Sequence, residues 1–575
     1  MYQTNYTIER TLHPKSVYVT LLLLLIIANH LKATPVAAMV VGSGTSASCT
    51  EASLAAAIAA GGNVTFNCGT ANTTITISSE IEIRNNVSIN GEGKITLQGS
   101  GGRIFFHRSY GTATSTLTLK NLTITGGRAN GVDNAANGGA IRSLNNSIDG
   151  KTYPQTLNID GVTFSNNDIT LTSYSPGKGL NAYDFGGGAI FTQGGYLNVT
   201  NSTFTGNDAN NGAGGAIHIL QSSVTIHGSS FASNSAIGST PADSVGGAIY
   251  VDGMKDDNGQ LQITRSTFTG NRTYNSGGAI HVNMYQNNNR FSVSQSSFIE
   301  NKVEGGTRAQ GGSIGGGSTV FGTNSGNASI EISNSVFKSN SAKKTLGAGD
   351  SADKGPSEDG SGGALAFPQR ARITISNSTF YDNKAFGTKY NANGGALYVV
   401  NNSDPFQIVN STFANNHAGW VGGAISNSQI GGQPGGVLRN TLFSNNTAGA
   451  ITNFQQHCSA ELTDGGNNLQ YPGRLTDGNY FNDVTCLKGK SAPSQKNLPD
   501  FRDPKLSPLA DNGGPTQTMA IGTDSPAYNG GNSATCPELD QRGYKRNGIC
   551  DIGAYEAGGM PFVPSVRVYI PLARK

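Results

Sequence analysis

The central part of the chain repeats one short pattern, and this repeat limits the fold more than any other feature. A Phe is followed three residues later by an Asn, and two apolar residues stand seven and five positions before the Phe. Units recur every ~30 residues, a period typical of arrays in which each unit packs on its neighbours. The pairs are Phe164/Asn167, Phe204/Asn207, Phe231/Asn234, Phe268/Asn271, Phe298/Asn301, Phe337/Asn340, Phe380/Asn383, Phe413/Asn416 and Phe443/Asn446.

Each unit predicts three short strands. Alternating apolar residues, such as Leu157 and Ile159, indicate the first strand, and a Ser-Thr-Phe segment indicates the second. A Gly-Gly-Ala-Ile or Gly-Gly-Ala-Leu segment indicates the third. These segments begin at Gly138, Gly187, Gly214, Gly246, Gly277, Gly362, Gly394 and Gly422, with Gly311-Gly312-Ser313-Ile314 as a degenerate copy. The units are too short for helical crossovers, so successive turns of a coil must stack directly, ~4.8 Å apart.

The pattern therefore predicts an all-β fold, a right-handed parallel β-helix of the pectate-lyase type, over residues 69–455. Leu, Ile, Val and Phe would stack inside it. The Asn of each unit would sit at a sharp turn, bond backbone groups and tolerate the left-handed conformation. The glycines would supply positive φ or close backbone approach. With 79 Gly in 575 residues, a helical array is excluded, because each interior Gly costs a helix about 1 kcal/mol.

The N-terminal residues indicate export. Residues 1–38 carry basic residues, an apolar core from Val17 to Ala28 and small residues before a cut after Ala38, which is typical of a signal peptide. The alternative is an uncleaved anchor, but the core is shorter than the ~20 residues that a membrane span needs. We expect no transmembrane span in the mature chain. Residues 39–68 would form a cap with a helix that starts at Thr50, ends at Gly61 and places Leu54 and Ile58 on one face.

The cysteines lie only near the two ends of the chain. An even count in an exported protein suggests disulfides, most simply between neighbours along the chain. These pairs are Cys49–Cys68, Cys458–Cys486 and Cys536–Cys550. A zinc site is the rival interpretation, but no Cys-x-x-Cys spacing or suitably placed His supports it.

Charge and acidic residues give little support for other ligands. The formal charge of +3 falls to +1 for the mature chain, and no basic run supplies phosphate contacts, so we expect no nucleic-acid partner. We expect no metal site and no cofactor. Weak Ca²⁺ binding is an alternative at Asp350, Asp353, Glu358 and Asp359, which a surface loop also explains.

One column of residues is a candidate binding face. In each Gly-Gly-Ala-Ile strand the Ile should point inward, so the next residue should point outward. The residues there are Arg142, Phe191, His218, Tyr250, His281, Ala366, Tyr398 and Ser426. The rings of Phe191, His218, Tyr250, His281 and Tyr398 are our candidates for contact with sugar rings or another protein. The alternative is that they only stack on one another, which stabilises each pair by about 0.2–1 kcal/mol.

Insertions before the Gly-Gly segments offer a second set of candidates. They all leave the coil on the same edge, and loops on a rigid scaffold commonly carry binding. Their candidate residues are Tyr174, Tyr183, Phe185, Asp243, Tyr274 and Tyr390.

The combination of Gly-Gly-Ala-Ile/Leu with Phe-x-x-Asn resembles the repeats of chlamydial polymorphic membrane proteins and of other secreted bacterial β-helix proteins. Residues 456–556 resemble the choice-of-anchor Q domain through Asn512-Gly-Gly-Pro-Thr-Gln-Thr, Ser525-Pro-Ala, Asp540-Gln-Arg-Gly and Cys550-Asp-Ile-Gly-Ala-Tyr-Glu556. The first resemblance implies a surface-exposed protein, with adhesion in several relatives. The second implies a C-terminal cap or envelope-association module, followed by a tail at 557–575.

These observations predict a secreted, cell-surface β-helix protein with a non-catalytic role in adhesion or envelope structure. Its partners would be surface glycans or envelope components, and we expect a monomer. The alternative is a polysaccharide lyase or hydrolase, which needs a base or paired carboxylates on neighbouring coils. We assign no catalytic residue. Asp540, Arg542, Asp551 and Glu556 form a possible catalytic cluster, but we interpret them as a structural ion-pair and turn network.

Overall fold

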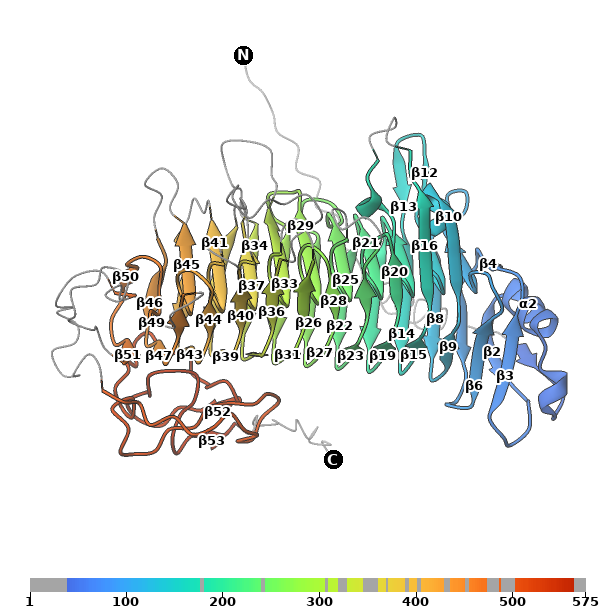
Figure 1. Ribbon diagram of the computed structural model, residues 1–575. Helices are drawn as coiled ribbons and strands as arrows, with labels where there is room; N and C mark the ends of the chain where they lie inside the picture. Colours follow the sequence, from blue (N-terminus) through green and yellow to red (C-terminus); the bar gives the residue numbers. More distant parts are fainter. Residues whose placement is uncertain are drawn as a thin grey trace, which may run out of the picture.

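The computed structural model is a long solenoid of stacked coils, with its C-terminal region lying along one side (Figure 1). The structure describes residues 39–175, 180–238, 244–305, 309–318, 328–344, 360–368, 371–387, 392–400, 405–428, 435–449, 454–472, 486–487 and 502–562. The proposed signal peptide lies outside them. Four sheets make up the solenoid, and nearly all their strands pair in parallel with the equivalent strands one coil away. The predicted parallel β-helix is confirmed.

From Ser115 to Ser428 each coil passes through four sheets, I, II, III and IV, in that order, whereas the earlier coils have no strand in sheet III. Sheet I contains β1 (Met39–Val41), β2 (Gly62–Phe66), β5 (Val87–Asn90), β8 (Ser115–Lys120), β14 (Gln155–Asp160), β18 (Tyr196–Thr200), β22 (Ser223–His227), β26 (Gln260–Thr264), β30 (Arg290–Ser294), β34 (Ser329–Ser333), β38 (Arg372–Ser376), β42 (Gln407–Val409), β46 (Val437–Arg439) and β50 (Thr463–Asp464).

Sheet II holds the repeated Phe residues. It contains β3 (Thr73–Ile77), β6 (Ile95–Gly99), β9 (Thr123–Thr125), β15 (Thr163–Ser165), β19 (Thr203–Thr205), β23 (Ser230–Ala232), β27 (Thr267–Thr269), β31 (Ser297–Ile299), β35 (Val336–Lys338), β39 (Thr379–Tyr381), β43 (Thr412–Ala414), β47 (Leu442–Ser444) and β51 (Leu469–Tyr471).

Sheet III has the shortest strands. It contains β10 (Arg128–Val132), β16 (Asp168–Ser173), β20 (Asp208–Asn210), β24 (Ser235–Ala236), β28 (Arg272–Thr273), β32 (Lys302–Glu304), β36 (Ser341–Lys343), β40 (Lys384–Phe386), β44 (His417–Ala418), β48 (Thr447–Ala448) and an antiparallel last strand, β49 (Phe454–Gln455).

Sheet IV follows the Gly-Gly segments. It contains β4 (Ile81–Ile83), β7 (Phe105–Arg108), β11 (Ile141–Leu144), β17 (Ile190–Gln193), β21 (Ile217–Leu220), β25 (Ile249–Asp252), β29 (Ile280–Met284), β33 (Ile314–Ser318), β37 (Leu365–Phe367), β41 (Leu397–Val400) and β45 (Ile425–Ser428). Two small antiparallel pairs lie outside these sheets: β12 (Asn146–Ile148) with β13 (Lys151–Tyr153), and β52 (Tyr544–Lys545) with β53 (Met560–Pro561).

The repeated Phe residues form one continuous stack inside the solenoid. The rings of Phe204 and Phe231 lie 4.7 Å apart and nearly parallel, as do those of Phe231 and Phe268. All three side chains are fully buried. In-register stacking of like side chains therefore builds the core, as the sequence predicts.

The repeated Asn residues form a second internal ladder, with one correction to the predicted turn. The amide of Asn234 donates to the carbonyl of Phe204 at 3.0 Å and to the side-chain oxygen of Asn271 at 3.0 Å. Its bonding to the backbone is thus confirmed. The left-handed residue is the one before it, Ser233 (φ 53°), so the Asn itself does not take that conformation. A buried amide stabilises this turn because it satisfies the backbone groups there.

The Gly-Gly pairs allow close approach between coils. Gly214 has a φ of 69°, and a Cβ atom on Gly215 would lie 2.2 Å from the carbonyl oxygen of Gly247 in the next coil. Only glycine fits at both positions.

The N-terminal end is closed by a helix and a disulfide, as expected. Helix α2 (Glu51–Ala60) has Thr50 as its N-cap and Gly61 as its C-cap, and it buries Leu54 and Ile58. A 3₁₀ turn, η1 (Ser46–Ser48), precedes it. All three predicted disulfides are present: Cys49–Cys68, Cys458–Cys486 and Cys536–Cys550. Within the described residues, no helix is long and apolar enough to span a bilayer.

One turn position organises the contact with the C-terminal region. From β9 to β51, the residue two positions before each strand of sheet II has positive φ, and we call this set the turn column: Asn121, Gly161, Asn201, Gly228, Arg265, Gln295, Asn334, Asn377, Asn410, Asn440 and Asn467. The side chains of Asn334, Asn377 and Asn410 donate to the carbonyls of Asp540, Leu539 and Asp551, respectively. The C-terminal region, residues 502–562, is therefore held along the side of the last coils (Figure 1).

Candidate functional site

The predicted aromatic column exists, but its most important rings are buried. Phe191, His218 and Tyr250 point away from the Phe core and have exposed fractions of 1%, 0% and 1%. Their rings lie about one coil apart, with centroids 5.0 Å (Phe191–His218) and 4.9 Å (His218–Tyr250) from each other. The expectation of an exposed binding face is wrong for these three residues. Their stacking on one another, the alternative that we considered, is confirmed.

A covering segment contributes to the burial of His218. The insertion after β16 includes a 3₁₀ turn, η4 (Ala182–Asp184), and the buried residue Phe185. Phe185 packs with Ile169 and Leu171 in a small second core outside the coil. Burial lowers the pKa of His218 to about 3, against weaker opposing interactions with the carbonyls of Phe185 and Ala213. The covering segment is not periodic, so the repeat pattern did not reveal it.

Polar partners surround the next part of the column. The side chain of Asn283 donates to the hydroxyl of Tyr250 at 3.3 Å, and its oxygen lies 3.2 Å from Nε2 of His281. Tyr285 donates a hydrogen bond to Asp252. Burial raises the pKa of Asp252 and lowers that of His281 to about 4. This network holds the column in place rather than opening it to solvent.

The remaining predicted residues are dispersed. His281 and Tyr398 are partly buried, and Tyr398 lies between Ala366 and Ser426 on sheet IV. Tyr174 packs against the second core, and Tyr274 is partly buried. The acidic candidates Asp350, Asp353, Glu358 and Asp359, together with Asp243 and Tyr390, lie outside the described residues. Within the described part of the chain, no three His, Cys, Asp or Glu side chains are placed to hold a metal.

The acidic and basic cluster near the C-terminus is structural. Arg542 contacts the carboxylate of buried Asp540 at 2.7 Å, and Arg546 contacts buried Glu556 at 2.9 Å. Burial raises the pKa of Asp551 to about 6, while the backbone amides of Asn529 and Ala557 donate to its carboxylate. The carboxylates are occupied by partners inside the region, so our interpretation as an ion-pair and turn network is confirmed.

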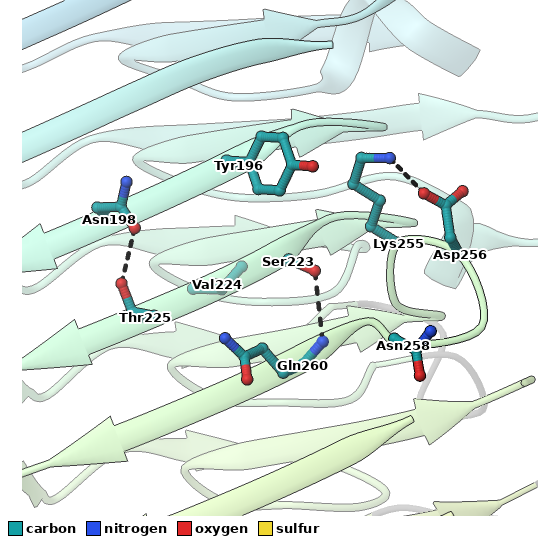
Figure 2. A pocket seen from close by; sticks show the side chains of 9 residues that line it. All are labelled: Tyr196, Asn198, Ser223, Val224, Thr225, Lys255, Asp256, Asn258 and Gln260. Atoms are coloured by element: carbon teal, nitrogen blue, oxygen red, sulfur yellow. Dashed lines mark hydrogen bonds and ion pairs between the residues drawn. The ribbon is translucent and has the colours of Figure 1, made fainter. Parts of the chain in front are cut away.

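An open groove on sheet I has aromatic and polar side chains that solvent can reach (Figure 2). Its volume is about 430 Å³. Tyr196, at the start of β18, is 42% exposed, and Nζ of Lys255 lies 5.5 Å from the centre of its ring. The groove is lined by Tyr196, Asn198, Ser223, Val224, Thr225, Lys255, Asp256, Asn258 and Gln260.

Local structure fixes the groove's shape. Lys255 and Asp256 follow β25 in the loop that leads to β26 and form an ion pair, in which Lys255 is mostly buried and Asp256 exposed. The hydroxyl of Thr225 donates to Asn198 at 2.7 Å, and the backbone amide of Gln260 donates to the hydroxyl of Ser223 at 3.3 Å (Figure 2). The polar floor is thus held in order across neighbouring coils.

The groove continues around the loop. A second hollow of about 230 Å³ shares Lys255 and Asp256 with it and reaches Tyr285 and Gln286 on the far side. One tyrosine therefore lies on each side of the Lys255–Asp256 loop. Sequence analysis missed these residues, because they lie at strand starts and in a loop outside the repeated motif. The signal that was available was Tyr196, an aromatic residue at a position occupied by Thr156 and Ser223 in the adjoining coils.

Comparison with known proteins shows that two segments of the repeat are similar to a known repeat family. Residues 265–283 and 410–428 match the model of the Chlamydia polymorphic membrane protein repeat. Each matched segment contains a Phe-x-x-Asn pair and the following Gly-Gly-Ala-Ile. This repeat family is associated with the bacterial outer surface, and the match supports the predicted resemblance. No curated protein and no solved structure matches the chain.

Proposed function

We propose that the chain is a bacterial surface or secreted binding protein whose β-helix carries a groove for an uncharged glycan. The observation that carries the proposal is the exposed ring of Tyr196 beside the ordered polar floor of Asn198, Thr225 and Gln260. An aromatic face packs against the apolar face of a sugar ring, while amides and hydroxyls bond its hydroxyl groups. The match to repeats of surface proteins supports the location.

An uncharged ligand suits the groove better than an anionic one. Its cation, Lys255, is already paired with Asp256, so the lining has no surplus charge. Asp256 is also the one carboxylate among the lining residues, whereas paired-carboxylate hydrolysis requires two. Binding is therefore the function that this groove supports best, and adhesion is the role that follows from binding at a surface.

The C-terminal region fits a supporting role in this proposal. Its resemblance to the choice-of-anchor Q domain favours association with the envelope. The C-terminal region lies along one side of the later coils (Figure 1) and contributes no residue to the lining of the groove on sheet I.

Binding to a panel of neutral oligosaccharides tests the proposal. We expect Tyr196→Ala to weaken binding about tenfold, which corresponds to ~1.4 kcal/mol. Tyr110→Ala is the matched control, because Tyr110 is also exposed but lies outside the groove. Absence of binding by the unmodified protein, or equal binding by Tyr196→Ala, would contradict the proposal. Release of shorter sugar products would instead favour a hydrolase.

A further inference from the structure

A second cleft lies between the turn column, at Arg265 and Gln295, and the C-terminal region. Its volume is about 580 Å³, within the range of small-molecule sites. The β-helix contributes Arg265, Ser266, Thr267, Gln295 and Ser297, and the C-terminal region contributes Gly514, Pro515, Leu539, Arg542, Gly543 and Phe562. The cleft shares no lining residue with the groove around Tyr196.

Arg265 is an unusual residue for its backbone position. It has a φ of 49°, and apart from Gln295 in the following coil the other residues of the turn column are Gly or Asn. Gly and Asn adopt this conformation readily, whereas an Arg there costs conformational free energy. Departures from local preference concentrate at functional positions. The choice of Arg at this turn therefore points to a role for its side chain.

The guanidinium of Arg265 is oriented and retains binding capacity. Its Nε donates to Oε1 of Gln295 at 3.0 Å. Among the residues that the structure describes, Arg265 forms no ion pair with a carboxylate, and its side chain is exposed. The two terminal nitrogens are thus positioned to bind one carboxylate in a bidentate manner.

The other cation at the cleft is already neutralised. Nε and Nη2 of Arg542 donate to the carboxylate of Asp540 at 2.8 and 2.7 Å. The guanidinium also lies between the rings of Tyr544 and Tyr555, at 4.3 and 3.8 Å from their centres. The cleft therefore has one available positive charge, at Arg265.

The remaining lining matches a sugar ring. Phe562 is 49% exposed and provides an aromatic face, and Leu539 and Pro515 extend the apolar wall. Thr267 and Ser297 begin neighbouring strands, β27 and β31, and supply hydroxyl groups one coil apart. A hydroxylated ring that bears a carboxylate complements this combination of groups.

We propose that this cleft binds a uronic acid residue of an acidic glycan, with the sugar carboxylate on Arg265 and the ring against Phe562. The site is independent of the proposed groove for neutral glycans. One surface would thus recognise two kinds of sugar at separate positions.

Calorimetry with a glucuronate-containing hyaluronan tetrasaccharide, and with its methyl ester, tests this proposal. Arg265→Asn is the main variant, because Asn occupies the same turn position two coils away on either side, at Asn201 and Asn334, and preserves the fold. We expect Arg265→Asn, Phe562→Ala and esterification each to weaken binding at least tenfold. Arg502→Gln, an exposed control outside the cleft, and Tyr196→Ala should bind the acidic tetrasaccharide normally.

Several results would overturn the proposal. These are absence of binding by the unmodified protein, equal binding of acid and ester, or unchanged binding by Arg265→Asn with a normal melting temperature. Preferential binding of a peptide with a free C-terminal carboxylate would also overturn it. Loss of neutral-glycan binding by Tyr196→Ala concerns only the groove on sheet I, so the two proposals fail separately.

Discussion

The coils around Phe204 and those around Phe380 share one interior but differ along the turn column. The Phe rings stack at 4.7 Å between Phe204 and Phe231 and at 4.6 Å between Phe380 and Phe413. In contrast, the turn residue Asn201 is exposed, whereas Asn410 is completely buried beneath the C-terminal region. The interior residues thus stabilise the coil in both places, whereas the residue at the turn position determines where the C-terminal region binds.

The chemistry of asparagine explains this attachment. The C-terminal region has little regular secondary structure, so many of its carbonyl groups need donors from elsewhere. Asn334, Asn377 and Asn410 supply side-chain amides to those carbonyls. Gly161 and Gly228, in the open coils, permit the same turn but offer no side-chain donor. We call coils with turns up to Gln295 the open coils and those from Asn334 onward the covered coils.

The largest effect tests whether the two sets of coils share an equivalent interior. Phe268→Ala in the open coils and Phe413→Ala in the covered coils should each reduce the free energy of unfolding by about 3–5 kcal/mol. Both rings are fully buried in the same stack, so the losses should be similar. Urea denaturation followed by circular dichroism measures them, with half-buried Thr269→Ala as a control. A much smaller loss at either Phe would show that the interior is not uniform.

Loss of the buried ion pair between Arg546 and Glu556 should weaken the contact between the C-terminal region and the covered coils. Glu556→Gln removes the charge that Arg546 contacts at 2.9 Å, and breaking such a pair costs about 3 kcal/mol. Arg546 also donates to Asn377, so the C-terminal region should loosen from the coils. Hydrogen exchange should increase at Leu539 and Gly553 but not at Phe204. Unchanged exchange in the C-terminal region would contradict this coupling.

The repeat allowed much of this fold to be predicted, because its information is local and periodic. The spacing of Phe164 and Asn167 predicted both internal ladders, and the short separations of the cysteines predicted the disulfides. The burial of His218 could not be predicted, because the segment around Phe185 that covers it does not repeat. The groove at Tyr196 and Lys255 was missed for the same reason. The periodic residues specify the coil, whereas the groove and the buried column depend on loops and insertions that do not repeat.

Low pH should reduce the stability of the open coils, because the segment around Phe185 buries His218. His218 is buried and neutral, because burial lowers its pKa from the ordinary value of 6.5 to about 3. Because the unfolded chain binds a proton more readily, the stabilisation is complete above pH 6.5 and is lost as the pH falls towards 3. This loss amounts to ~2 kcal/mol between pH 6.5 and 5.

His218→Phe should remove this contribution to the pH dependence while keeping an aromatic ring between Phe191 and Tyr250. The variant should lose less stability than the unmodified protein between pH 6.5 and 5. Thermal melts at both pH values measure the difference. The control is His227→Gln, at the exposed end of β22. This variant should leave the pH dependence of stability close to that of the unmodified protein. An identical pH dependence in His218→Phe would contradict the assignment.

The smallest expected effect, that of Asn201→Gly, is compared with the equivalent change at Asn377 and separates the two sets of coils most directly. Asn377→Gly removes an amide that donates to Leu539 at 2.7 Å and an oxygen that accepts from Arg546 at 2.9 Å, and should cost about 1–3 kcal/mol. Asn201→Gly makes the same change at an exposed turn, where neighbouring coils already have Gly161 and Gly228, and should cost only a few tenths of a kcal/mol. Limited proteolysis of the C-terminal region provides the comparison, since Asn377→Gly should speed its cleavage and Asn201→Gly should not. Equal cleavage in both variants would mean that the turn residue does not direct the attachment.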